Sequence, residues 1–451
     1  MTQTTQTTRP ANGADGPERP APGPLPRASF RSRALALFPA GSNGEYGFPP
    51  DLVPVIERGH GCRVWDTDGR EFLDFTMAWG SALVGHAHPR VIEAATRQAA
   101  LGANFAAVNR RSVELAERIA ALSPCAERIR FVASGTEATL LCLRVAQAAT
   151  GRPKVLRFEG AYHGQHPVGI AGMLNGRPLP PPHADPSGAG ASWVERDVLV
   201  APFNDLAATE SILAGFAHEL AAVIVEPLHR CLVPVPGFLE GLRAATRRHG
   251  IALVFDEVVT GFRLAPGGAQ EYYGVVPDLV AYGKALGGGF PIGAYAGRAA
   301  WMDVVDEHRL PGPNYAWSAS TTGGNPVSCA AALATLDVLA EPGVYPRLHE
   351  SGRRLRRVLA ETVAAAGESA RILGDGPLAQ LAFSAAPVVD QKSWLASDRV
   401  RGRALMLGLS RAGVFLNPMG TKLYLSLAHD DAAIAEFGDR LAAALAATRP
   451  A

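Results

Sequence analysis

The chain has 451 residues, with 43 Lys plus Arg against 42 Asp plus Glu and a formal net charge of +1. Because the charges nearly balance, nonspecific electrostatic binding to nucleic acid or to an anionic membrane is not expected. Hydrophobic residues make up 47% and charged residues 19%, so the chain can bury large cores and is not a disordered, solvated protein. At about 150 residues per domain, the length predicts two or three domains.

The cysteine pattern and the hydropathy bear on location. The five cysteines lie far apart with no C-x-x-C pair, which argues against a zinc ribbon or a disulfide framework. A reducing compartment fits this pattern, and we expect a cytoplasmic protein. The sequence has no run of about 18 apolar residues, so no membrane span is predicted.

The N-terminal part of the sequence predicts a tail followed by a hairpin. Residues 1–28 contain six prolines and almost no large apolar side chain, which predicts a disordered tail that we bound at residues 1–30. No apolar secretory segment is apparent in it. Two short alternating runs around Asp68-Gly69 predict a hairpin over 61–75. Amphipathic patterns predict helices over 91–100 and 112–122.

From residue 129 to 300 apolar strands alternate with helices. The expected helices cover 136–151 and 238–250, and the expected strands are 129–133, 154–158, 221–225, 251–255, 278–282 and 292–297. Continuous apolar strands between helices predict a largely parallel sheet covered on both faces, in an α/β/α domain.

The C-terminal part predicts a second, smaller α+β lobe. Helical patterns cover 327–340, 345–367 and 431–447, with strand-like pieces at 377–384, 413–418 and 422–429. We expect the hairpin near residue 70 to join this lobe, which makes it discontinuous. The predicted boundaries are 31–85 for the N-terminal segment of the small domain, 86–330 for the large domain and 331–451 for the rest of the small domain.

Residues that carry chemistry follow the predicted strands. In an open α/β sheet ligands bind beyond the carboxyl ends of the strands. The residues found there are Ser134-Gly135-Thr136, Tyr162-His163, Glu226, Asp256 and Lys284. Their convergence at one edge is hard to explain by packing alone.

Each of these residues also has a structural interpretation. Gly135 and Thr136 at a helix start suit a phosphate, or they belong to an ordinary N-cap. Asp256 follows a wholly apolar strand and needs a cationic partner, either a pyridinium N–H or Arg263. Tyr162 stacks on a planar ring or is a buried tyrosine at a sheet edge.

Lysine is rare in this chain. Only four of the 43 basic residues are lysines, so a lysine here is more than usually expected to act as an amine. Lys284 lies in a glycine-rich turn, where it can form an imine with a bound aldehyde, contact a phosphate or be a plain surface charge. The other three, Lys154, Lys392 and Lys422, lack comparable surroundings.

Other site classes fit poorly. The histidines show no clustered acidic or cysteine ligands, so no metal site is predicted. Neither a P-loop, a G-x-G-x-x-G after the first strand, nor a G-x-S-x-G serine motif occurs.

Together these residues resemble a known family. The sequence is similar to the class III, fold-type I, pyridoxal-phosphate aminotransferases, and most closely to their glutamate-1-semialdehyde 2,1-aminomutase branch, from about residue 55 to 447. The motifs that carry the resemblance are DGREFLDF, WGSALVGHAHP, FVASGTEAT, FEGAYHG, VIVEP, PGFLEGLR, VFDEVVTGFR, PDLVAYGKALGGGFPIGAYAG and STTGGNP.

The resemblance implies a cofactor, pyridoxal 5′-phosphate, and a role for each matched residue. Lys284 would hold the cofactor as an internal aldimine and move the proton, while Asp256 would pair with the pyridinium nitrogen. Gly135 and Thr136 would bind the phosphate, Tyr162 and Val258 would cover the two ring faces, and His229 would contact the cofactor. Thr321 would reach the phosphate of the neighbouring subunit, so the resemblance implies a homodimer with shared active sites.

The sequence departs from that branch at positions that bear on the substrate. The stretch GSNGEYGFPPDL lacks the arginine that holds the substrate carboxylate in aminomutases, Thr421 stands near the place of a glutamate, and His229 replaces a glutamine common in the family. We therefore predict an aminotransferase acting on a small amine or amino acid and a carbonyl acceptor. The alternatives are an aminomutase, a racemase or decarboxylase on the same fold, and a non-catalytic cofactor-binding protein. We expect specificity to lie near Tyr46, Trp79, His229 and the 170–195 loop.

Overall fold

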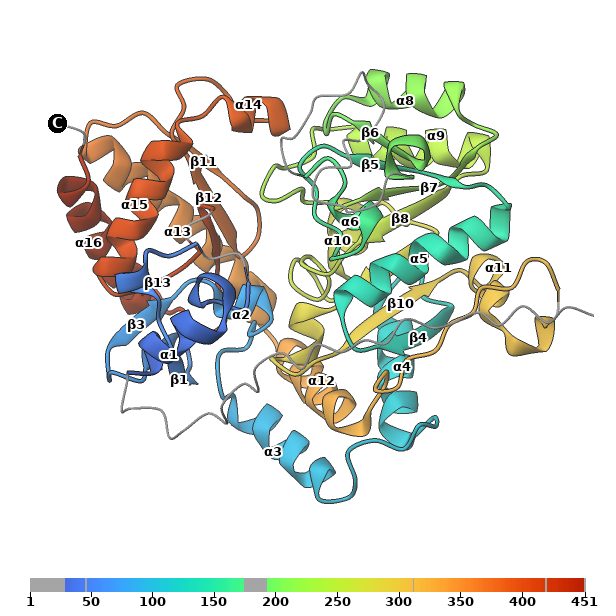
Figure 1. Ribbon diagram of the computed structural model, residues 1–451, viewed down its shortest axis with the longest axis horizontal. Helices are drawn as coiled ribbons and strands as arrows, with labels where there is room; N and C mark the ends of the chain where they lie inside the picture. Colours follow the sequence, from blue (N-terminus) through green and yellow to red (C-terminus); the bar gives the residue numbers. More distant parts are fainter. Residues whose placement is uncertain (1–28, 45–46, 174–192, 311, 418–419, 450–451) are drawn as a thin grey trace, which may run out of the picture.

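The computed structural model describes residues 29–44, 47–173, 193–310, 312–417 and 420–449, in two lobes (Figure 1). The predicted tail over 1–28, Tyr46 and most of the 170–195 loop lie outside the described residues.

The larger lobe is built on a seven-stranded sheet of order β4-β10-β9-β8-β7-β5-β6. The chain of pairs from β6 through β5, β7 and β8 to β9 is parallel, whereas β10 is antiparallel to both of its neighbours. The strands are β4 (Arg128–Val132), β5 (Lys154–Phe158), β6 (Val198–Ala201), β7 (Leu220–Val225), β8 (Ala252–Asp256), β9 (Leu279–Tyr282) and β10 (Gly293–Gly297). The largely parallel α/β sheet predicted from the sequence is confirmed.

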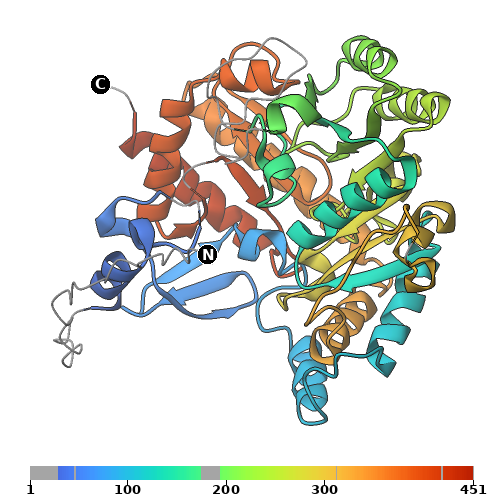
Figure 2. The ribbon, with the colours of Figure 1, turned by 45° about the vertical axis from the view of Figure 1, so that its right-hand side comes forward.

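Both faces of this sheet are covered, because successive side chains of a strand point to opposite sides. On β8, Leu253 and Phe255 join one apolar cluster while Ala252 and Val254 join another. Helix α5 (Gly135–Thr150) packs across the second face, in contact with five strands of the sheet. The cluster on the first face draws on α3 (Pro89–Ala99), α4 (Arg110–Leu122), α9 (Phe238–His249) and α12 (Pro326–Leu339). These layers can be followed in Figure 2.

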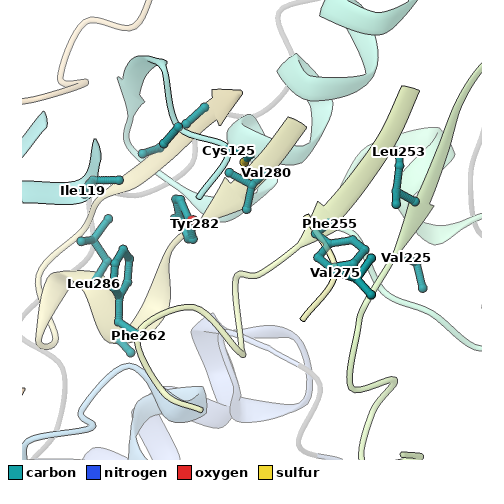
Figure 3. Packing of buried hydrophobic residues seen from close by; sticks show 14 of the residues in the cluster. Ile119, Cys125, Val225, Leu253, Phe255, Phe262, Val275, Val280, Tyr282 and Leu286 are labelled. Atoms are coloured by element: carbon teal, nitrogen blue, oxygen red, sulfur yellow. The ribbon is translucent and has the colours of Figure 1, made fainter. Parts of the chain in front are cut away.

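The first-face cluster extends to the end of β9 and the turn that carries Lys284. Phe262 and Tyr282 pack with ring centroids 4.9 Å apart, and Leu286 lies beside them in Figure 3. All three are buried. This packing fixes the backbone on both sides of Lys284, so the turn that carries the lysine rests on a rigid base.

The smaller lobe is built from an N-terminal and a C-terminal segment of the described chain. One sheet has the order β1-β2-β3-β13, in which β3 pairs in parallel with β13. A second, antiparallel sheet has the order β11-β12-β14. The strands are β1 (Ile56–His60), β2 (Arg63–Asp66), β3 (Glu71–Asp74), β11 (Arg371–Leu373), β12 (Leu378–Ala382), β13 (Val414–Phe415) and β14 (Lys422–Tyr424). The hairpin around Asp68-Gly69 and its union with the C-terminal lobe are as predicted.

Three long helices cover this lobe, namely α13 (Val344–Ala365), α15 (Arg399–Arg411) and α16 (Asp431–Ala447). The shorter helices of the molecule are α1 (Phe30–Leu37), α2 (Met77–Gly80), α6 (Pro167–Ile170), α7 (Val194–Asp197), α8 (Leu206–Gly215), α10 (Gly268–Tyr273), α11 (Ala299–Met302) and α14 (Gln391–Leu395). The exact domain boundaries stay a prediction.

Among the described helices, no single one has the length and apolar composition of a membrane span. The pair α12 and α13, bent by 79° at the break between them, passes that test together on length and composition alone.

Buried histidines make the stability of the fold depend on pH. His429 is buried, its Nε2 donates to the carbonyl oxygen of Asp74 at 3.0 Å, and its Nδ1 accepts from the backbone N–H of Ser426 at 3.1 Å. Both contacts suit the neutral ring, and burial lowers the pKa of His429 to about 4. Between that value and the ordinary pKa of about 6.5, the unfolded chain binds a proton that the folded chain does not.

We therefore expect the urea midpoint of unfolding to fall as the pH drops from 6.5 to 4, since the folded pKa is the lower one. Burial lowers the pKa of His166 and His229 to about 4 as well, so they act in the same direction. His429→Gln should flatten the pH dependence of the urea midpoint. His218→Gln, at an exposed position, is the control. Equal pH slopes in wild type and His429→Gln would contradict this prediction.

Candidate active site

Most of the predicted site residues lie at one edge of the large sheet. Strands β5, β7, β8 and β9 run in the same direction, and β4 shares it because β10 is antiparallel to both β4 and β9. Their carboxyl ends therefore lie at the same edge, as expected for a ligand site in such a sheet.

The start of α5 offers backbone N–H groups to an anion. The Ser134 hydroxyl caps the helix by accepting from the N–H of Glu137 at 3.2 Å. The N–H groups of Gly135 and Thr136 precede the first intrahelical hydrogen bonds, and the helix dipole favours a negative charge there. The N-cap and phosphate interpretations of this turn are thus compatible.

Three glycines allow the backbone to approach Thr136 and Val258 closely. A Cβ atom at Gly164, where φ is +107°, would lie 2.8 Å from Thr136 Cα. A Cβ atom at Gly135 would lie 2.8 Å from both γ-methyl carbons of Val258, and one at Gly283 would lie 3.3 Å from the nearer of them. The start of α5, Val258 and the turn before Lys284 are therefore in contact, as a compact cradle requires.

Asp256 ends β8 and is 5% exposed. Its Oδ2 lies 2.8 Å from His163 Nδ1, and its Oδ1 accepts from the backbone N–H of Val258 at 3.0 Å. The alternative partner considered from the sequence, Arg263, instead donates to the carbonyl oxygens of Val259 and Gly80. The Nε2 atom of His163 is buried and has no hydrogen-bond partner among the described residues.

Lys284 follows β9 in a short 3-10 turn and has a φ of +42°, which is uncommon outside glycine. Burial is the main reason that the pKa of its ammonium lies below the ordinary value, and Lys422 lowers it further. Tyr424, Asp256 and Glu226 act in the opposite direction. A lowered pKa raises the share of free amine, which is the nucleophilic form.

Glu226 follows β7 and organises the loop beside it. Its two carboxylate oxygens accept from the backbone N–H of Tyr162 at 3.0 Å and of Arg230 at 3.3 Å. Burial by itself raises the pKa of Glu226, but the basic side chains around it reverse this effect and lower the pKa to about 2. Glu226 is therefore an anion that holds Tyr162 in place.

His229 and Thr321 make their hydrogen bonds with residues outside this group. His229 is fully buried, its ring stacks on Phe203 at 4.7 Å, and its Nε2 donates to the carbonyl oxygen of Glu159 at 2.9 Å. Thr321 is exposed, and its carbonyl oxygen accepts from Asn104 Nδ2 at 2.9 Å. Their predicted contacts with the cofactor stay predictions.

The small lobe contributes side chains that sequence reasoning missed. Tyr424 packs against α2 so tightly that a Cβ atom at Gly80 would lie 2.5 Å from its ring. Lys422 Nζ lies 5.1 Å from the centre of the Tyr424 ring, and its charge acts on Lys284. The expectation that Lys422 lacks comparable surroundings was wrong, because β14 brings it to the site from 138 positions further along the chain. Only the rarity of lysine in the sequence pointed to it.

These features fit one kind of ligand. The cradle at α5 suits a phosphate, the buried Asp256 suits a protonated ring nitrogen, and Lys284 suits an aldehyde. In the described part of the chain, no group of three or more His, Cys, Asp or Glu side chains could hold a metal ion. The fold and the site thus define an enzyme of the fold-type I class, which uses pyridoxal phosphate.

Comparison with known proteins gives the family. The family model for class-III aminotransferases matches residues 49–445. Glutamate-1-semialdehyde 2,1-aminomutase 2 of Brevibacillus brevis is 40% identical over 383 residues, which cover 83% of this chain and 87% of that protein. The chain belongs to the class-III aminotransferases.

Solved structures agree with this family. The crystal structure of an omega-transaminase from Sphaerobacter thermophilus superposes with a TM-score of 0.87 at 35% identity, covering 93% of this chain and 97% of that one. A transaminase with bound pyridoxal phosphate superposes with a TM-score of 0.83 at 28% identity, covering 93% and 96% of the two chains. The predicted fold, family and cofactor are confirmed, and the protein is a pyridoxal-phosphate enzyme.

Proposed function

We propose that the protein is an aminotransferase, which moves an amino group from an amine donor to a carbonyl acceptor in two half-reactions. The observation that carries this proposal is the Lys284 amine, with a lowered pKa, at the sheet edge that also holds the buried Asp256. The missing arginine in the 41–52 stretch and Thr421 in place of a glutamate favour a transaminase over an aminomutase.

The cofactor supplies a ring that withdraws electrons from the carbon next to the transferred nitrogen. We assign Lys284 as the residue that holds the cofactor covalently and then, once released, carries a proton as the free amine. Burial of Lys284 favours this assignment, because it makes the uncharged amine easier to form.

We assign Asp256 to the ring nitrogen. Its low exposure makes a cationic partner necessary, and a carboxylate there would keep that nitrogen protonated. The contact with His163 supports this role, since it orients the carboxylate and leaves part of it for a second donor.

The remaining assignments concern binding. Gly135 and Thr136 would hold the phosphate at the start of α5, which the free N–H groups there support. Val258 would cover one face of the ring, in line with its contact with the cradle, and Tyr162 the other, held by Glu226. His229, whose Nε2 donates to the carbonyl oxygen of Glu159, would contact the cofactor.

An absorbance experiment tests the proposed function. Purified holoenzyme is mixed with a panel of amine donors, and we expect at least one donor to convert the bound cofactor to its amine form, as seen in its spectrum. Added keto acid should then restore the original spectrum. An aminomutase would instead turn over a single substrate with no keto acid, and a binding protein would show no change with any donor.

The aminomutase alternative is kept because of the relatives. A protein of that name is 40% identical to this chain, whereas the transaminase structures are 35% and 28% identical. Product analysis in the same experiment also separates a racemase or a decarboxylase, since neither transfers the amino group.

We further propose a cytoplasmic homodimer. The free state of all five cysteines supports a reducing compartment. Exposed apolar side chains near Thr321 support a dimer surface, because a monomer rarely exposes several large ones together. Those on the segment before α4 are Leu101, Phe105 and Val108, with exposed fractions of 73%, 52% and 84%, and Trp317, close to Thr321 in sequence, is 62% exposed.

A charge on this surface should break the dimer. Val108→Asp is expected to raise the dimer dissociation constant by about tenfold or more, since it buries an unpaired carboxylate. Light scattering should then show the 47.3 kDa monomer, with activity lost because Thr321 no longer reaches a partner. Val400→Asp, at an equally exposed valine of the small lobe, is the control. A dimer that survives Val108→Asp at all concentrations would contradict the prediction.

A further inference from the structure

Arg230 and Lys422 reach the site from different lobes and have no acidic partner among the described residues. We propose that these two side chains bind the carboxylate of the substrate, so that one substrate of this enzyme is an amino acid rather than a simple amine. The inference rests on the proposed aminotransferase function and assigns to these residues a role that the N-terminal stretch lacks.

Arg230 is held in an unusual backbone conformation. It is a non-glycine residue with a φ of +61°, and its N–H donates to Glu226 Oε2 at 3.3 Å. Such strain persists where the surroundings impose it, and it often marks a functional position. Glu226 thus fixes the Arg230 backbone through a main-chain contact, while the guanidinium makes no hydrogen bond or ion pair with the part of the chain that the structure describes.

Lys422 is fixed by the small lobe. It pairs with Gln380 in the antiparallel β12–β14 ladder, and alternation along β14 puts it on the same face as Tyr424. Among the described residues, Lys422 makes a cation–π contact with Tyr424, with Nζ 5.1 Å from the centre of the ring. Leu228 and Cys231, which flank Arg230 in the chain, pack in the same apolar cluster as Leu423 and Tyr424 next to Lys422, so the two cations come from neighbouring segments. Arg230 and Glu226 also act electrostatically on Lys422.

Several other partly or fully buried cations among the described residues have acidic partners, whereas Arg157 and Arg263 donate to backbone carbonyl oxygens. Arg243 pairs with Asp278 at 2.8 Å, Lys154 pairs with Glu219 at 3.2 Å, and Arg401 pairs with Glu368. A cation withdrawn from water is costly unless it is paired, and two such cations side by side also repel each other. Unlike these side chains, neither Arg230 nor Lys422 has a carboxylate or carbonyl partner in the described part of the chain, and a bound anion would supply one.

The acids of the site are already engaged. Asp256 contacts His163, and Glu226 accepts from two backbone N–H groups. With Asp256 assigned to the ring nitrogen, Glu226 is the carboxylate that remains opposite Lys422 and Arg230, so one of these two positive charges is uncompensated. The planar fork of an arginine matches a carboxylate, and a lysine adds a point charge beside it.

The cofactor phosphate is the rival anion for this pair. Its cradle lies at the start of α5, against Val258 and Gly164, whereas the Arg230 backbone contacts Glu226 after β7, and the charges of Arg230 and Lys422 both act on that carboxylate. We therefore expect both cations to face the substrate and not the phosphate, and the test below includes cofactor affinity for this reason.

The experiment compares donors that differ only in the carboxylate. Alanine, β-alanine and 4-aminobutanoate are each matched with the amine that carries a methyl group in place of the carboxylate. The kcat/KM of the half-reaction is measured for wild type, Arg230→Gln and Lys422→Met. Arg399→Gln and Lys392→Met, at exposed positions, are the controls. Binding of butanoate, which has no amine, is followed by calorimetry on each holoenzyme.

We expect wild type to prefer at least one amino acid over its matched amine. Each substitution should reduce kcat/KM for that amino acid by about 10- to 100-fold, the loss typical of a hydrogen bond to a charged group, while the matched amine changes little. Butanoate affinity should fall in parallel, cofactor affinity should stay unchanged, and Lys422→Arg should retain most of the discrimination.

Different failures have different meanings. If no donor changes the cofactor spectrum, the aminotransferase function itself is wrong. If donors react but amino acid and amine lose rate equally in the variants, the two cations act on Lys284 or on the fold, and the carboxylate assignment is overturned. Weaker cofactor binding in both variants would assign the pair to the phosphate and likewise overturn the proposal.

Discussion

Replacing Lys284 with alanine is expected to lower turnover by at least about 10⁴-fold, because the variant lacks both the covalent link to the cofactor and the amine that carries the proton. The other basic groups near the site cannot substitute for it. An arginine cannot form an imine, and Lys422 is anchored on a different strand of the other lobe.

Three measurements check the effect of Lys284→Ala. Turnover should be lost with the best donor, and the cofactor should be removable by dialysis, since it is then held only by non-covalent contacts. Borohydride should attach the cofactor to the peptide that contains Lys284 in wild type and to no peptide in the variant. Lys392→Ala is the matched control, at an exposed lysine. Wild-type turnover in Lys284→Ala, or a label on another residue, would show that the assigned mechanism is wrong.

Asp256→Asn is expected to slow the chemical step by about 10²- to 10³-fold, the scale of losing one aimed electrostatic group in a buried site. An amide has nearly the shape of the carboxylate and can still contact His163 and the N–H of Val258. It carries no charge, however, and so cannot hold a proton on the ring nitrogen.

Single-turnover measurements with the holoenzyme test this prediction, because they separate proton transfer from donor binding. The thermal midpoint and the amount of bound cofactor should change little, which separates an electrostatic effect from unfolding. Asp278→Asn is a useful comparison, since Asp278 pairs with Arg243 and should therefore affect stability rather than the proton-transfer rate. Unchanged kinetics in Asp256→Asn would mean that the acid serves only to hold His163.

Some features of the fold are not visible in the sequence pattern. Strand β6 is only four residues long, and α15 carries two glycines and four arginines, so neither stands out as a regular element. The direction of β10 is likewise not encoded in its apolar run, because parallel and antiparallel strands buried on both faces have the same composition. Pairing with β4 and β9 decides it.

The sequence by itself determined the local chemistry of this protein: which residues follow each apolar strand, and hence that Thr136, Asp256 and Lys284 share one edge of a sheet. That inference succeeds because parallel strands place their carboxyl ends together whatever their order. Tertiary structure alone decided which groups from distant segments join them. His163 as the partner of Asp256, and Lys422 beside Arg230, depend on how loops and lobes pack, and packing is set by contacts between residues far apart in the chain.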